Sequence, residues 1–149
     1  MKKQTAPSQS SGTEQLFRNV LCPIDFSRIS IPAIELALRL AVQNKGTIFL
    51  LCVIPAGDAD SPKADLEHAA TNQLRAIGLK WFEGVIAFET VVRTGEPAAA
   101  IVEAETQLNI HATVMATHGR SGVDYALLGS VTEQVVRRST RPVITVNPQ

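Results

Sequence analysis

The sequence predicts an α/β protein with an open, doubly wound parallel sheet. Apolar runs of strand length alternate strictly with amphipathic runs of helix length, in the order βαβαβαβαβ. The run at residues 47–54 is apolar throughout, as expected for a parallel strand covered on both faces. The connections are short and the chain has 149 residues, which fits one domain with right-handed crossovers and helices on both faces of the sheet.

The composition excludes several classes of function. Hydrophobic residues make up 45% of the chain, and 14 basic residues balance 14 acidic residues. This balance predicts no binding to nucleic acid or to an anionic membrane, and no apolar run has the length of a membrane span. Cys22 and Cys52 lie in apolar runs, where we expect buried, reduced thiols; a disulfide between neighbouring strands is the alternative.

Residues 1–15 form a polar segment rich in Lys, Gln, Ser and Thr. No apolar segment follows its lysines, so it is not a secretory signal. We expect a flexible tail that the fold does not need, a folded domain over residues 16–149, and a cytoplasmic location.

The first half of the chain predicts two strands and two helices. Strand 17–25 precedes a helix at about residues 30–44, which Gly46 closes with a left-handed cap. Strand 47–54 precedes a helix at about residues 63–77, closed by Gly78. The first helix has an apolar stripe of Ile34, Ala37, Leu38, Ala41 and Val42, and the second has one of Leu66, Ala70, Leu74 and Ile77. Trp81 and Phe82 are interpreted as packing residues in preference to a ligand platform.

The second half continues the alternation. Strand 85–93 leads through a turn to a helix whose apolar stripe is Ala98, Ile101, Ala104 and Leu108. Strand 112–116 then precedes a loop with several glycines, a helix at about residues 131–139 and strand 142–146. Ser130 and Glu133 match a capping box for the last helix.

A candidate anion site follows strand 112–116. The loop after this strand contains Gly119 and Gly122 and ends at Gly129-Ser130, where the helix begins. Backbone amides converge at such a helix N-terminus, and the helix dipole adds partial positive charge. Asp25 adds a carboxylate where the first strand ends, and α/β sheets bind their ligands at the carboxyl ends of their strands.

The spacing of these glycines resembles the nucleotide-binding signature of the universal stress protein family. Gly119, nine further residues and the pair Gly129-Ser130 match the signature, whereas Ala116 stands where the family has its first glycine. The resemblance covers about residues 17–146. It implies an adenine nucleotide alpha hydrolase-like sheet of order 3-2-1-4-5, in which Asp25 and the loop after Ala116 flank one crevice at the switch point.

By this resemblance the ligand is ATP or a related adenine nucleotide, with or without Mg²⁺. Asp25 and the backbone of Val53 correspond to positions that hold adenine and ribose, residues 115–119 to positions around the ribose and phosphates, and residues 129–132 to positions that bind phosphate oxygens. The residues assigned to the site are Pro23, Asp25, Val53, Met115, Ala116, His118, Gly119, Arg120, Gly122, Gly129, Ser130, Val131 and Thr132.

Simpler roles are open for several of these residues. The alternative for Ser130 is a helix cap with no ligand role, and the alternative for Asp25 is a carboxylate that only stabilises a turn. Gly119 and Gly122 have the alternative of serving the turn alone, and Arg120 that of a solvated side chain. The three histidines have no metal-ligand spacing, so no metal site is predicted. Neither G-x-x-x-x-G-K-[ST] nor G-x-G-x-x-G occurs.

Together these features favour a nucleotide-binding regulatory module of the stress response, with at most slow hydrolysis and no assigned catalytic residue. One alternative is a dimeric interaction protein that binds no nucleotide, which Ala116 keeps open; the other is an ATP-hydrolysing switch enzyme. Family members commonly pair through the last strand, and residues 143–146 are short, apolar and uncharged. We therefore expect a homodimer through this edge.

Overall fold

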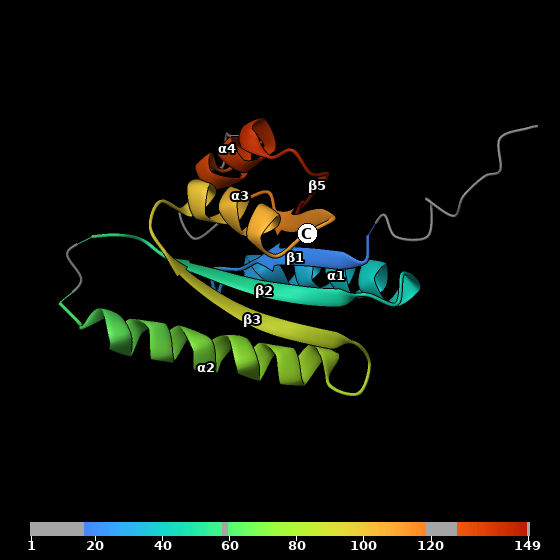
Figure 1. The fold of residues 1–149 in the computed structure, drawn as a ribbon, viewed down its shortest axis with the longest axis horizontal. Helices are drawn as coiled ribbons and strands as arrows, with labels where there is room; N and C mark the ends of the chain where they lie inside the picture. The colour runs from blue at the N-terminus through green and yellow to red at the C-terminus, as the bar shows by residue number, and fades with distance from the viewer. Residues whose placement is uncertain (1–16, 58–59, 119–127, 149) are drawn as a thin grey trace, which may run out of the picture.

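The computed structural model describes residues 17–57, 60–118 and 128–148, and these form one five-stranded parallel sheet with helices on both faces (Figure 1). The sheet order is β3-β2-β1-β4-β5, as the sequence resemblance implies. The elements are β1 (Asn19–Pro23), η1 (Arg28–Ser30), α1 (Ile31–Gln43), β2 (Thr47–Ile54), α2 (Lys63–Phe82), β3 (Ala87–Thr94), α3 (Pro97–Gln107), β4 (Ala112–Ala116), α4 (Ser130–Arg138) and β5 (Val143–Val146). The tail predicted at residues 1–15 lies outside the described residues.

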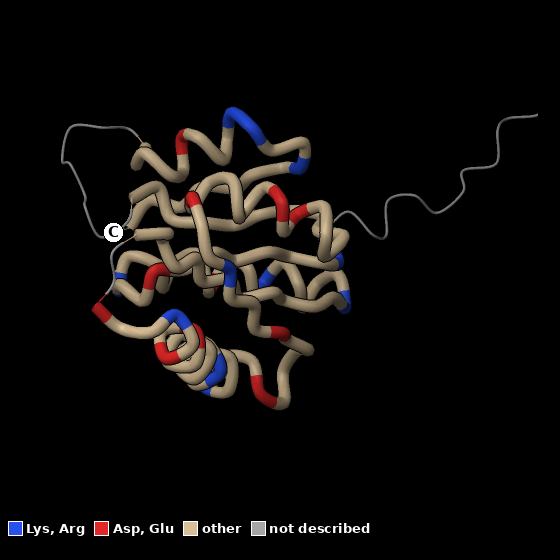
Figure 2. Tube along the Cα trace, turned by 60° about the vertical axis from the view of Figure 1, so that its left-hand side comes forward, with Lys and Arg blue, Asp and Glu red and all other residues tan. Residues whose placement is uncertain are grey.

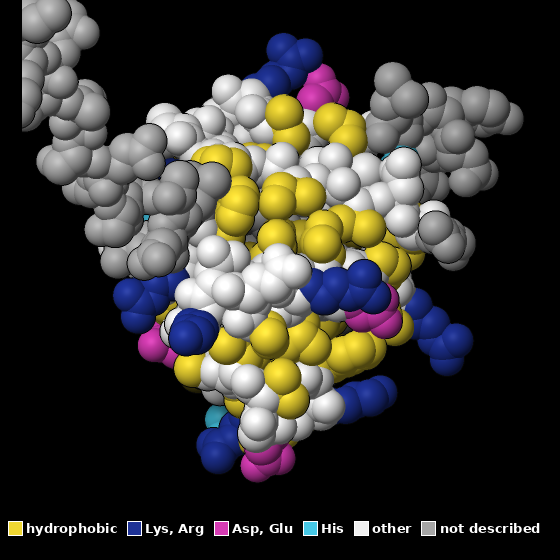
Figure 3. Space-filling model, turned by 90° about the vertical axis from the view of Figure 1, so that its right-hand side faces the viewer, with side chains coloured by type: hydrophobic (Ala, Val, Ile, Leu, Met, Phe, Trp, Pro, Cys, Tyr) yellow, Lys and Arg dark blue, Asp and Glu magenta, His cyan; other side chains and the backbone are white. Residues whose placement is uncertain are grey.

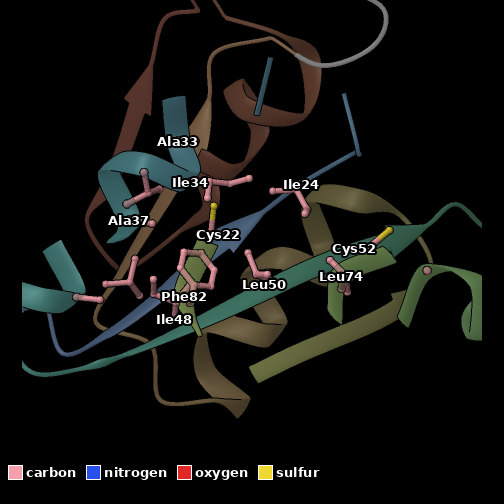
Figure 4. Close-up of a cluster of buried hydrophobic side chains, with 14 residues drawn as sticks. Cys22, Ile24, Ala33, Ile34, Ala37, Ile48, Leu50, Cys52, Leu74 and Phe82 are labelled. Atoms are coloured by element: carbon pink, nitrogen blue, oxygen red, sulfur yellow. The ribbon is translucent and has the colours of Figure 1, made fainter. Parts of the chain in front are cut away.

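The core has two layers, one on each face of the sheet. Helices α1 and α2 cover one face, where alternate residues of β1 and β2 such as Cys22 and Leu50 meet the small residues of α1. Figure 4 shows this cluster, which includes Phe82 of α2. Helices α3 and α4 cover the other face and pack on residues of opposite parity, such as Leu21 and Leu51. Two covered faces explain why the central strands are continuously apolar.

Two glycines have roles that differ from the predictions. Helix α2 continues through Gly78 to Phe82. The ring of Phe88 on β3 lies where a side chain at position 78 would be, so this glycine permits α2 to pack closely on β3. After α1 the left-handed residue is Lys45, at φ 49°, and not Gly46. A Cβ at Gly46 would overlap the carbonyl of Arg18, so this glycine permits a close backbone approach.

Charge is spread over the molecule. Figure 2 shows Lys and Arg interspersed with Asp and Glu along the helices and connections, in keeping with the zero net charge. At the end of the molecule where the strands begin, apolar side chains gather near the centre of the face (Figure 3). Where the chain is described, no helix combines the length and the apolar character needed to cross a membrane.

Candidate functional site

The candidate site lies at the carboxyl ends of β1 and β4, the two neighbouring strands at which the direction of winding reverses. Strand β1 ends at Pro23, which pairs with Leu51, while β2 continues to Ile54. The edge of the sheet is therefore stepped, and Val53 lies two residues beyond the last partner that β1 supplies to β2. Val53 and Pro23 are both half-buried at this step.

Asp25 follows β1 and organises the turn that leads to α1. Its Oδ1 accepts hydrogen bonds from the Ser27 amide at 3.0 Å, the Ser27 hydroxyl at 2.6 Å and the Ser30 hydroxyl at 3.2 Å. The turn role that the sequence left open is thus present in the structure. The role of Asp25 as a nucleoside ligand stays a prediction.

The N-terminus of α4 is fastened directly to the end of β4. The Gly129 amide donates to the Thr117 carbonyl at 2.6 Å, and the Thr132 hydroxyl donates to the Ala116 carbonyl at 2.9 Å. These two bonds hold the first turn of α4 beside the strand end. Within the described part of the chain, the amides of Ser130, Val131 and Thr132 donate to no other residue, so this turn presents backbone donors.

The predicted capping box is wrong. Gly129, with φ −65° and ψ 159°, is the N-cap residue, and Ser130 is the first, exposed residue of the helix. Glu133 pairs with Arg137, at 2.9 Å, on the outer face of α4. Ser130 therefore does not cap its own helix, and its side chain lies on the exposed first turn of α4.

The remaining predicted residues differ in their exposure. Met115 and Ala116 are 6% and 9% exposed, so the side chains at this end of β4 are buried in the core. Thr132 is 3% exposed and its hydroxyl is already used by Ala116. His118 is half-buried, with Nδ1 at 3.0 Å from the Thr117 hydroxyl. Three predicted residues, Gly119, Arg120 and Gly122, lie outside the described residues.

Sequence reasoning did not single out Thr117, which connects three segments at the site. Its amide donates to the Val146 carbonyl at 3.0 Å, its hydroxyl donates to Asn147 Oδ1 at 2.9 Å, and its carbonyl accepts from Gly129. No sequence signal marks this residue, because each partner is distant along the chain. Ser27 and Ser30 were also missed, although the Asp-x-Ser spacing from Asp25 is a turn signal.

Groups for metal binding are sparse at this edge. Among the described residues there is no cluster of three or more His, Cys, Asp or Glu side chains that could hold a metal ion. The chemistry that the described site offers is therefore backbone N–H donation, the Ser130 hydroxyl and the Asp25 carboxylate. These donors suit the anionic end of a ligand, and the carboxylate suits a polar, uncharged end that donates hydrogen bonds.

Comparison with known proteins defines the class. The model of the Universal stress protein family matches residues 16–147, and the chain belongs to this family. Universal stress protein MJ0531 of Methanocaldococcus jannaschii is 25% identical over 142 residues, which cover 89% of this chain and 84% of the relative. Universal stress protein MJ0577 of the same organism is 29% identical over 154 residues, which cover 88% of this chain and 95% of the relative.

Solved structures share the fold. The structure of MJ0577 superposes with a TM-score of 0.82 at 25% identity, covering 90% of this chain and 98% of that one. A universal stress protein in complex with cAMP has a TM-score of 0.66 at 23% identity, covering 89% and 98% of the two chains. The universal stress protein from Archaeoglobus fulgidus in complex with dAMP has a TM-score of 0.64 at 19% identity, covering 87% and 96%.

Proposed function

We propose that this protein is a regulatory module that binds an adenine nucleotide, ATP in the first instance, in the crevice between the ends of β1 and β4. One observation carries the proposal: two hydrogen bonds, Gly129 to Thr117 and Thr132 to Ala116, fix the amide-bearing first turn of α4 at the switch point of the sheet. A phosphate is the ligand that such a helix N-terminus attracts.

The rest of the crevice suits the other end of a nucleotide. The stepped edge leaves the backbone of Val53 beside the end of β1, where an adenine edge would find peptide donors and acceptors. Asp25 stands at the same edge and would accept from ribose hydroxyls. That family members of the same fold have been solved with cAMP and with dAMP supports an adenine nucleotide as the class of ligand.

The first test is titration calorimetry with ATP, in the presence and absence of Mg²⁺, followed by AMP and cAMP. Gly129→Val should abolish binding, because a branched side chain would stand between the phosphate and the amides. The backbone of Gly129 has a conformation that any residue adopts, so the substitution should introduce no backbone strain and the variant should fold. Absence of heat with every nucleotide, for a folded protein, would leave the nucleotide-free interaction protein as the better function.

A substitution of Asp25 needs a control variant, because Asp25 also stabilises the turn between β1 and α1. Asp25→Asn should weaken ATP binding by about tenfold or more, through loss of charge-assisted hydrogen bonds. Ser27→Ala disturbs the same turn but keeps the carboxylate. Equal losses in the two variants would show that Asp25 acts only through the turn.

Ala116 tests the departure from the family pattern. If its methyl group obstructs the ligand, Ala116→Gly should bind ATP more tightly than the parent protein. An unchanged affinity would show that the crevice already accommodates the methyl group. Denaturing the purified protein and identifying released nucleotide by mass spectrometry gives an independent answer.

The proposal includes at most slow hydrolysis, because no catalytic set has been recognised in the sequence. Phosphate release from ATP should be slow even with Mg²⁺ present. Multiple turnovers at the rates of ordinary enzymes, about 1 s⁻¹ or faster, would favour the switch-enzyme alternative.

We also propose that two copies pair through β5, an edge strand of the sheet. The Pro142 carbonyl accepts from the amide of Thr113 on β4 and the Val146 carbonyl from the amide of Thr117 just after β4, so the peptide groups of Thr145 face the open edge. Thr145→Pro would remove an outward donor and spare the β4 ladder. Light scattering should show a dimer for the parent protein and Thr145→Ala, and a monomer for Thr145→Pro; a monomeric parent at tens of micromolar contradicts the pairing.

A further inference from the structure

A second pocket lies outside the nucleotide crevice, between η1, the first turn of α1 and the last turns of α2. Its volume is about 180 Å³, and its apolar wall includes Ile24, Ile34 and Ile77. Figure 4 shows Ile24 and Ile34 beside each other at one edge of the core cluster. An apolar cavity of about 150 Å³ holds a benzene ring, so this pocket has room for one ring and a small substituent.

The rim of the pocket is positively charged. Arg28 and Lys80 line it, and none of the described residues that line it is acidic. Neither cation forms an ion pair with another residue in the described chain. Two cations beside an apolar wall, with no acidic side chain among the lining residues, complement a ligand that has an apolar body and one negative charge.

Two aromatic residues complete the pocket. Trp81 lines it, and Lys80 Nζ lies 5.9 Å from the centre of the indole ring. Phe26 lines it from a left-handed backbone conformation at φ 64°, which is unfavourable for an aromatic residue. The fold therefore holds Phe26 in a strained conformation at the pocket, and such strain is concentrated at functional sites.

We propose that this pocket binds a small aromatic monocarboxylate, with its ring against the apolar wall and its carboxylate toward Arg28 and Lys80. The inference does not depend on nucleotide binding. The pocket adjoins the turn of Asp25, because Ser27 and Ser30 both line it and both donate to Asp25 Oδ1. Asp25 itself is not among the lining residues.

Trp81 makes the proposal directly measurable, since it is the single tryptophan of the chain. Titration of the full-length protein with phenylacetate, up to about 20 mM at constant ionic strength, should change its fluorescence saturably, with a Kd on the order of 1 mM for so small a ligand. Phenylacetamide has the same shape without the charge and should bind about tenfold more weakly. Acetate, which lacks the ring, should give no change.

Charge variants show whether the signal comes from this pocket. Arg28→Gln and Lys80→Gln should each weaken phenylacetate about fivefold to tenfold and leave phenylacetamide unchanged. Arg39→Gln on α1 and Lys63→Gln on α2 are matched controls outside the pocket and should change neither ligand. Equal affinity for acid and amide, or equal loss in the control variants, would overturn the carboxylate assignment.

The Gly129→Val variant distinguishes this pocket from the proposed nucleotide crevice. Phenylacetate should bind with the same affinity in the Gly129→Val protein, so a failure of the nucleotide proposal leaves this result intact. Loss of phenylacetate binding in that variant, or the absence of any saturable change, overturns the inference. Binding of the peptide N-acetyl-Phe-Glu-amide tenfold more tightly than phenylacetate would assign the pocket to a peptide partner and overturn the small-molecule ligand.

Discussion

At the scale of single residues, Cys22 shows how burial controls chemistry. It lies fully buried in the core cluster between the sheet and α1, with Cys52 further along the same face (Figure 4). Burial raises the pKa of the Cys22 thiol from 9.0 to about 12. Cys22 and Cys52 are not joined by a disulfide in the structure, and the environment of Cys22 makes it an inert packing residue.

This environment predicts slow thiol labelling. In a Cys52→Ala protein at pH 8, the raised pKa lowers the thiolate fraction of Cys22 about 1000-fold relative to an unfolded thiol. Labelling by a disulfide reagent should be slower by at least that factor in buffer than in concentrated urea. Comparable rates in the two solvents would contradict the burial of Cys22.

The same pKa predicts a loss of stability in alkaline solution. Below pH 9 the thiol is neutral in both states, whereas between pH 9 and about 12 only the unfolded chain ionises, so the folded state loses stability as pH rises. At pH 10 this loss is on the order of 1 kcal/mol. Urea unfolding at pH 8 and pH 10 should show this extra loss for the parent protein and not for Cys22→Ala.

Gly78 gives a prediction that opposes helix propensity. Alanine normally stabilises a helix interior by about 1 kcal/mol relative to glycine. Here a Cβ would overlap the ring of Phe88, so Gly78→Ala should instead destabilise the protein by about 1–3 kcal/mol. Urea unfolding checks the sign, and Phe88→Leu in the Gly78→Ala background should recover part of the loss.

At the scale of elements, Glu96 caps α3 and connects it to α4. Its carboxylate accepts from the amides of Ala98 at 3.0 Å and Ala99 at 2.7 Å, and Arg138 approaches it at 3.2 Å. The bonds from the Ala99 and Ala98 amides, followed by the hydrogen bond and charge of Arg138, hold the pKa of Glu96 below its ordinary value. The negative charge also suits the positive end of the α3 dipole.

Glu96→Gln should therefore lower stability at neutral pH. The pKa of Glu96 is depressed in the folded state. Its carboxylate therefore stabilises the fold fully at pH values above the unfolded-state pKa, and this stabilisation disappears as the pH falls through the folded-state pKa. The urea midpoints of parent and variant should differ at pH 7 and converge in acid. Glu35→Gln, an exposed change on α1, is the control and should have no such pH-dependent effect.

The elements also show what sequence can predict. The alternation of apolar and amphipathic runs predicted the α-helices and strands of the described chain, whereas the short helix η1 was not predicted. The signal is clearest for the central strands β1, β2 and β4, which are mostly buried. Helix ends were less predictable, because they depend on tertiary contacts: Phe88 occupies the space above Gly78, and the Arg18 carbonyl lies against Gly46. The capping box failed for a related reason, because the fold places Gly129 at the cap and turns Ser130 outward.

At the scale of the whole molecule, the order of the strands came from the family resemblance, because periodicity alone does not order a parallel sheet. That order brings Asp25 and residues 116–118 to one edge, although about 90 positions separate them along the chain. The bonds that complete the site were not predictable, since Thr117 joins β5, α4 and Asn147 across loops.

A buried carboxylate joins the elements at the other end of β4. Glu105 on α3 is 1% exposed and accepts from Thr113 Oγ1 at 2.7 Å and Ser139 Oγ at 2.6 Å. Ser139 in turn accepts from the Arg141 amide at 3.0 Å. Glu105 thereby fastens α3 to β4 and to the connection that positions β5, the edge proposed for pairing.

Glu105→Gln should destabilise the molecule by about 2 kcal/mol, because an amide nitrogen replaces one of two buried acceptors of hydroxyl hydrogen bonds. The weakening should concentrate where β5 is held, so the Thr113 and Thr117 amides, which donate to Pro142 and Val146, should exchange hydrogen faster than amides of β2. Urea unfolding and site-resolved hydrogen exchange measure the two effects. Glu103→Gln, an exposed change on the same helix, should alter stability by less than about 0.5 kcal/mol. A Glu105→Gln protein as stable as this control, with unchanged exchange at Thr113, would show that the carboxylate does not hold the β5 edge.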